Sequence, residues 1–178
     1  MVFTQVLNPP GGYVQACNSS PFLAADAATL DPAAFPRYMI GEADQDNARA
    51  RRARQLLGGE RAFSFEDFER LPVDSYLLEA PERLPALHDA WRALPAGDPL
   101  RERLADAVAV LGEWDHVARV DSVQTTLFLD WFERMFGPAS HTTPPPDPLE
   151  TLAAVIAGLE ADWGTWRVPW GEVNRLQR

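Results

Sequence analysis

Two positions in the chain carry side chains that could act as nucleophiles. Cys17 ends a short apolar run and has no histidine near it in the sequence, whereas a reactive thiolate needs a cationic or helix-N-terminal neighbour. We expect Cys17 to be a small, buried side chain. Asp121 and Ser122 stand directly before an apolar period that opens at Val123, where both residue types commonly cap a helix. The sequence favours capping over catalysis at this pair.

The histidines and acidic residues form no metal-ligand pattern. His88, His116 and His141 are scattered along the chain, and the GxSxG, P-loop, GxGxxG and HExxH motifs are absent. Asp115 and His116 are adjacent at the end of an expected helix, where neighbouring side chains point in different directions. We expect each histidine to lie on a helix surface or in a loop, and we predict no metal site.

Composition narrows the class of protein. The 178 residues carry 16 basic and 26 acidic side chains, and the formal net charge of -10 would repel a nucleic-acid backbone. A single cysteine excludes an internal disulfide. No apolar stretch reaches the roughly 18 residues of a membrane span, and the first residues show no export signal. The chain is long enough to bury one sizeable core.

The segments that would position a site are predicted to be two strands, then a long loop, then helices with a proline-rich linker between two of them. Phe3–Leu7 and Tyr13–Cys17 suit two strands, joined by a turn over Pro9–Gly12. From Ser19 to Gly41 no period is sustained, which predicts a long loop of the kind often reserved for binding. Residues 138–148 are dense in proline and predict an exposed linker between helices.

Helices are predicted over most of residues 45–166. Asp46 or Asn47 could cap a helix through Leu57, which Gly58–Gly59 would end in a left-handed conformation. Ser64 opens a sequence that resembles a capping box. Apolar residues then recur at three- and four-residue spacing in four stretches, which predicts amphipathic helices with these residues in the core: Leu84 to Leu94, Leu104 to Trp114, Val123 to Met135 and Leu149 to Trp163.

One segment resembles a known family. The residues from Leu7 to Phe22, LNPPGGYVQACNSSPF, combine a tight turn, a strand and an asparagine at the strand's end. They are similar to the penicillin acylase family, including its acyl-homoserine-lactone and aculeacin acylase-like branch. There, a segment reading roughly NP-x-x-GY and then NN-x-P supplies an asparagine to the oxyanion hole. The resemblance assigns this catalytic role to Asn18.

The resemblance continues in order along the chain. The stretch Asn47–Leu57 looks like the family helix that opens with a functional arginine, and Arg49 is the best-matched residue. Similarity extends through Leu111–Asp115, Asp121–Phe136 and Trp170–Val173, so it spans nearly the whole chain. The ordered match implies that residues 1–178 are a fragment of the catalytic β subunit, with a strand and turn segment over residues 1–22.

The family implies an N-terminal-nucleophile hydrolase with an αββα-type catalytic subunit. The expected fold class is α+β, mainly helical in this segment and incomplete at both ends. The nucleophilic serine and the α subunit of the same precursor would lie upstream of Met1, so the isolated chain is expected to be inactive. Expected substrates are acyl amides such as penicillins, acyl-homoserine lactones or lipopeptides, with Phe22 and Tyr38 in the substrate-binding region.

The resemblance also implies a cellular location and an ion. Members of the family act in the periplasm or outside the cell, so the same location is expected for this chain. No cofactor is required for the chemistry. A structural calcium ion is possible by the same analogy, with Asp26 or Asp31 as candidate ligands.

Two alternatives remain open from the sequence. A stand-alone acidic helical protein could bind a partner through the loop from Ser19 to Gly41, provided that Phe22, Phe35 and Tyr38 are exposed. A hydrolase that begins at Cys17 after self-cleavage would be a third class, and it would require a chain product with Cys17 at its N-terminus.

Overall fold

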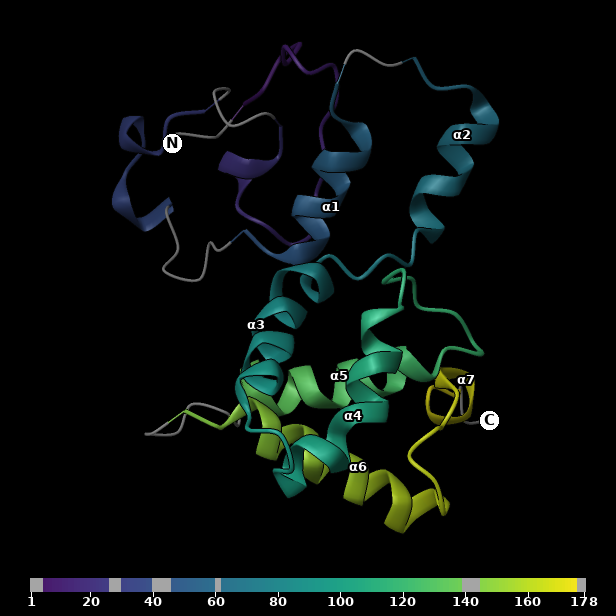
Figure 1. Ribbon diagram of the computed structural model, residues 1–178. Coiled ribbons are helices and arrows are strands. Elements are labelled where there is room, and N and C mark those ends of the chain that lie inside the picture. The colour runs from purple at the N-terminus through teal and green to yellow at the C-terminus, as the bar shows by residue number, and fades with distance from the viewer. Residues whose placement is uncertain (1–4, 26–29, 40–45, 60–61, 139–144, 176–178) are drawn as a thin grey trace. The chain divides into compact units, whose positions relative to one another are not determined.

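The protein is described by a computed structural model that covers residues 5–25, 30–39, 46–59, 62–138 and 145–175. Its contacts divide the chain into two compact units, Met1–Asp74 and Ser75–Arg178 (Figure 1). The described residues are mainly helical, and their only β pairing is a single bridge between Tyr76 and Val117. None of their helices combines the length and apolar character of a membrane span.

The first unit contains two α-helices whose caps are encoded locally. The Asn47 side chain accepts a hydrogen bond from the Ala50 N–H at the start of α1, and Ser64 accepts one from Asp67 at the start of α2. After α1, Gly58 is extended, and Gly59 is the residue in the left-handed conformation, with a φ of +94°. The elements of this unit are η1 (Pro21–Leu23), η2 (Pro32–Ala34), η3 (Arg37–Met39), α1 (Ala48–Leu57), α2 (Phe65–Arg70) and η4 (Leu71–Val73).

The two strands predicted near the N-terminus are not formed in the described residues. Residues 5–7 and 13–17 are irregular, although the predicted turn is present as a hydrogen bond from the Gly12 N–H to the Pro9 carbonyl. Gln15 makes one backbone bond, from its N–H to the carbonyl of Ala24. A strand requires a ladder of such bonds, and in this segment side chains take over much of the pairing.

The second unit consists of the helices that the apolar periods predict. Asp98, Ser122 and Asp147 cap the last three long helices through their side-chain oxygens. In the predicted linker, Pro138 has 3-10 helical conformation, residues 145–147 lie outside helices, and α6 begins at Pro148. The elements are α3 (Glu79–Ala93), α4 (Pro99–Gly112), α5 (Val123–Phe136), α6 (Pro148–Trp163) and α7 (Trp170–Val173).

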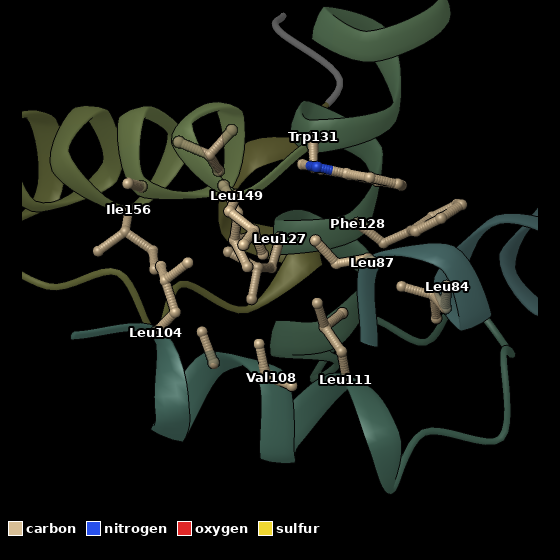
Figure 2. Close-up of a cluster of buried hydrophobic side chains, with 14 of the residues drawn as sticks. Leu84, Leu87, Leu104, Val108, Leu111, Leu127, Phe128, Trp131, Leu149 and Ile156 are labelled. Carbon is tan, nitrogen blue, oxygen red and sulfur yellow. The ribbon is translucent and has the colours of Figure 1, made fainter. Parts of the chain in front are cut away.

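The core of the second unit lies where α3, α4, α5 and α6 meet. Figure 2 shows apolar side chains from all four helices pointing toward one another. Trp131 is 2% exposed, yet its indole N–H donates to the Pro148 carbonyl at 3.0 Å, so its one polar atom is paired. The central members that the sequence predicted are Leu84, Leu87, Leu104, Val108, Leu111, Leu127, Trp131, Leu149 and Ile156, and Phe128 joins them without having been predicted. Trp163 was predicted to lie in the core, but it is 47% exposed.

The last helix is held against the loop before α5. The Gly171 N–H donates to the Val120 carbonyl at 2.7 Å, and the Trp170 N–H donates to the Ser122 carbonyl at 3.0 Å. A Cβ atom added to Gly171 would lie 2.9 Å from the Val120 carbonyl oxygen, which is too close for ordinary packing. Glycine is therefore required at this position by the close approach of two backbones.

A pair of identical substitutions tests this contact. Gly171→Ala should lower the free energy of unfolding by about 1–3 kcal/mol, since the added methyl group forces two backbone segments apart. Gly158→Ala should raise it by up to about 1 kcal/mol through helix propensity, because its Cβ would meet only the end of Arg134, at 3.5 Å. Urea unfolding followed by circular dichroism measures both changes. Equal effects of the two substitutions would contradict the proposed close approach.

His88 should make the stability of the second unit depend on pH. Its Nε2 atom is buried without a hydrogen-bond partner among the described residues. Burial lowers the pKa of His88, and Arg92 lowers it further, while Asp89 opposes both. Burial lowers the pKa of His116 as well. The folded state therefore prefers neutral imidazoles, and stability should fall as the pH drops below the ordinary value of about 6.5.

Unfolding at a series of pH values from about 7.5 to about 5 measures this dependence. His88→Gln should weaken the loss of stability at acid pH, and the remainder should come partly from His116. An unchanged pH dependence in His88→Gln would show that His88 does not exchange protons on unfolding.

Candidate functional site

Asn18 lies at a sharp turn in the first unit, after the segment that was predicted to be a strand. Its φ of +55° is in the left-handed region, which asparagine tolerates better than most residues with a side chain. The Asn18 side chain is exposed, whereas Gln15, three residues earlier, is buried with 7% of its surface exposed. The turn thus rests on a buried polar residue and presents an amide to the outside.

Side-chain amides hold the backbone of this turn. The Cys17 N–H donates to Gln15 Oε1 at 3.0 Å, and Gln15 Nε2 donates to the Leu23 carbonyl at 2.8 Å. Asn47, at the start of α1, donates from Nδ2 to the Cys17 carbonyl at 3.0 Å. The residues on both sides of Asn18 are therefore anchored, and backbone groups without a ladder partner are satisfied by side chains.

Arg49 contacts the Asn18 side chain directly. It lies in the first turn of α1, and its Nη2 donates to Asn18 Oδ1 at 3.1 Å. The sequence placed these two residues in one site although 31 positions separate them, and the structure brings them together. Both side chains are exposed, so the pair lies on the surface of the first unit.

The contact with Arg49 determines which end of the Asn18 amide is available to a ligand. A guanidinium group has only donors, so it must meet the oxygen end of the amide. The Nδ2 group, a neutral donor, is therefore the end turned away from Arg49. A neutral N–H donor in a fixed orientation can stabilise negative charge that develops on a carbonyl oxygen during attack.

The other arginines of α1 with described partners have structural contacts. Arg52 forms a bidentate ion pair with Asp74, with distances of 2.8 and 2.9 Å. Arg54 pairs with Asp46 and also donates to the Leu23 carbonyl at 3.4 Å. Each of these arginines ties α1 to another part of the first unit, whereas Arg49 is bonded to the amide that the sequence singles out.

The two predicted substrate-binding residues lie in different surroundings. Phe22 is buried at 6% exposure, and its ring meets that of Phe35 edge-on with a centroid separation of 5.3 Å. Tyr38 is 82% exposed. The partner-binding alternative required Phe22, Phe35 and Tyr38 to be exposed, and this condition is not met, because the two phenylalanines pack on each other. This removes most of the aromatic surface that a partner-binding loop would need.

The structure gives the other candidate residues ordinary roles or leaves them undescribed. Cys17 is half-buried rather than fully buried, and its backbone N–H and carbonyl bond to the Gln15 and Asn47 side chains. Asp31 caps η2 by accepting from the Ala33 N–H at 2.9 Å. Asp26 and His141 lie outside the described residues. No group of three or more potential metal-ligating side chains occurs within the described part of the chain.

In the second unit, Ser122 acts as a helix cap, as predicted. Its oxygen accepts hydrogen bonds from the Thr125 N–H at 3.0 Å and the Thr125 hydroxyl at 2.8 Å. Ser122 and Asp115 line an open groove of about 350 Å³ beside α5. Arg119 forms a bidentate pair with Asp115, and its hydrogen bonds lower the pKa of that carboxyl group to about 2. Neither polar residue is arranged as a nucleophile with a base.

Sequence reasoning missed the second role of Asn47 and the role of Gln15. Asn47 was identified only as a possible helix cap, but its amide also reaches the Cys17 carbonyl. Gln15 interrupts the run Tyr13–Cys17, and a polar residue in an apolar stretch is the signal that could have marked it as buried and bonded.

The structure joins an exposed asparagine amide and an arginine by a hydrogen bond, on a chain whose described residues are mainly helical. Comparison with protein families gives the class of protein. The family model described as penicillin amidase matches residues 3–178, which is nearly the entire chain. The chain belongs to the penicillin amidase family.

Replacing Arg49 should affect the site more than the stability of the fold. Arg49→Lys should change the free energy of unfolding by less than about 1 kcal/mol, because an exposed polar contact contributes little. Ala50→Leu, one position further along the same helix, is the control. Ala50 is fully buried, so the larger side chain should cost about 1–3 kcal/mol. Thermal unfolding measures both, and a large loss from Arg49→Lys would assign Arg49 a structural role.

Proposed function

We propose that this chain contributes the oxyanion-stabilising part of an acylase-type amide hydrolase. Asn18 supplies the donor, and Arg49 holds the Asn18 amide in the required orientation. The observation that carries the proposal is the hydrogen bond from Arg49 Nη2 to Asn18 Oδ1, which leaves Nδ2 as the end of the amide turned away from the guanidinium group. Membership of the penicillin amidase family supports hydrolysis of carbon–nitrogen bonds outside peptides.

The proposed reaction begins when a nucleophile attacks the carbonyl carbon of an acyl amide. As the carbon becomes tetrahedral, its oxygen gains negative charge, which Asn18 Nδ2 stabilises by donating a hydrogen bond. Collapse of this intermediate releases the amine and leaves an acyl-enzyme. Water then attacks the acyl carbon, and the same donor stabilises the second oxyanion before the carboxylic acid leaves.

The nucleophile in this proposal is a serine at the N-terminus of the catalytic chain, outside residues 1–178. Its own α-amino group would act as the base, as the family resemblance implies. The αββα-type fold would then belong to the complete catalytic subunit, with this segment as its helical part. The α subunit of the same precursor would complete the acyl pocket.

The proposed substrates are acyl amides such as penicillins, acyl-homoserine lactones or lipopeptides. Tyr38 is exposed and could contact the substrate directly. Phe22 would act as part of the wall behind such a surface, because it packs on Phe35. A periplasmic or extracellular location belongs to the same proposal.

Loss of the Asn18 donor should reduce turnover strongly. In the complete enzyme, with the segment that carries the N-terminal serine, Asn18→Ala should lower kcat about 10²- to 10³-fold. Release of the amine from a chromogenic acyl amide measures the rate. Asn8→Ala is a matched control, because Asn8 is also exposed and has a positive φ of +49°. Full activity of Asn18→Ala would refute the proposed function.

A further inference from the structure

We infer that Asn47 is a positioning residue for the oxyanion donor, in addition to its role as the cap of α1. The inference rests on the proposed function of Asn18. One planar amide makes two contacts: Nδ2 donates to the Cys17 carbonyl at 3.0 Å, and Oδ1 accepts from the Ala50 N–H at 2.9 Å. Both ends of the Asn47 side chain are therefore used, and its amide cannot flip without losing both bonds.

The Cys17 carbonyl belongs to the peptide group that leads into Asn18. Holding that carbonyl fixes the plane of the peptide, and rotation from this plane defines the left-handed φ of +55° at Asn18. Gln15 holds the preceding peptide group through the Cys17 N–H at 3.0 Å. The two amides thus set the direction in which the Asn18 side chain leaves the backbone.

Asn47 also links the donor to the residue that orients it. Arg49 is two positions after Asn47, in the first turn of the same helix. The backbone before Asn18 and the Asn18 side chain are consequently held from one helix end, by Asn47 and Arg49 respectively. A shift of this helix end would move both contacts together, and a displacement of about 1 Å at a catalytic group can cost about 10²-fold in rate.

An isosteric substitution separates the capping role from the positioning role. Asn47→Asp keeps an oxygen for the Ala50 N–H, and aspartate is as good a cap as asparagine. Its second oxygen replaces the Nδ2 donor and would face the Cys17 carbonyl, where two acceptors repel each other. A residue that only capped α1 would tolerate this change, whereas a positioning residue would not.

The test uses the complete enzyme and a chromogenic acyl amide. Asn47→Asp should lower kcat about 10- to 100-fold while KM stays close to that of the parent enzyme. Ser64→Asp is the control, since it also places an aspartate at a helix cap, that of α2, and should leave kcat unchanged. An unaltered kcat in Asn47→Asp would overturn the inference, and so would an equal loss in Ser64→Asp.

A double-mutant cycle shows whether Asn47 acts through Asn18. If it does, Asn47→Asp should cause no further loss of kcat in the Asn18→Ala background. Independent losses that multiply in the double mutant would overturn the positioning role and leave the proposed function intact. Full activity of Asn18→Ala alone would refute both the proposed function and this inference.

Discussion

The proposed role of the first unit depends on the hydrogen bond from Arg49 to the oxygen end of the Asn18 amide. Arginine can only donate, so its presence selects one orientation of an otherwise ambiguous amide. That orientation presents a neutral N–H group in a direction fixed by the fold. Electrostatic stabilisation depends on such prior orientation, because a donor that must reorganise during the reaction loses much of its effect.

The two units reach their order by different means. Helix packing dominates the second unit, where apolar side chains of four helices fill a common core (Figure 2). In the segment around Asn18, polar side chains take over from regular secondary structure, and Gln15 and Asn47 bond to the backbone of the turn. Such an arrangement suits a site, since a fully satisfied hydrogen-bond network holds particular polar atoms in place.

Local signals in the sequence were enough to predict much of this structure. The apolar periods predicted all four core helices, because apolar residues spaced 3.6 apart share one face only in a helix. Ser64 and Ser122 are helix caps, as predicted. The strand predicted at Tyr13–Cys17 was wrong. Its composition suits a strand, but Gln15 makes a single backbone pairing with Ala24, and the Cys17 backbone bonds to the side chains of Gln15 and Asn47. Family resemblance brought Asn18 and Arg49 together, but a contact across 31 positions, and the burial of Phe22 against Phe35, cannot be read from local spacing.

The most direct measurement is the crystal structure of the complete enzyme with an acyl phosphonate, whose tetrahedral phosphorus group imitates the reaction intermediate. Asn18 Nδ2 should lie about 2.7–3.1 Å from a phosphonate oxygen, with Arg49 still bonded to Oδ1. A phosphonate oxygen bound by other donors, with the Asn18 side chain turned away from it, would contradict the assignment of Asn18 to the oxyanion hole.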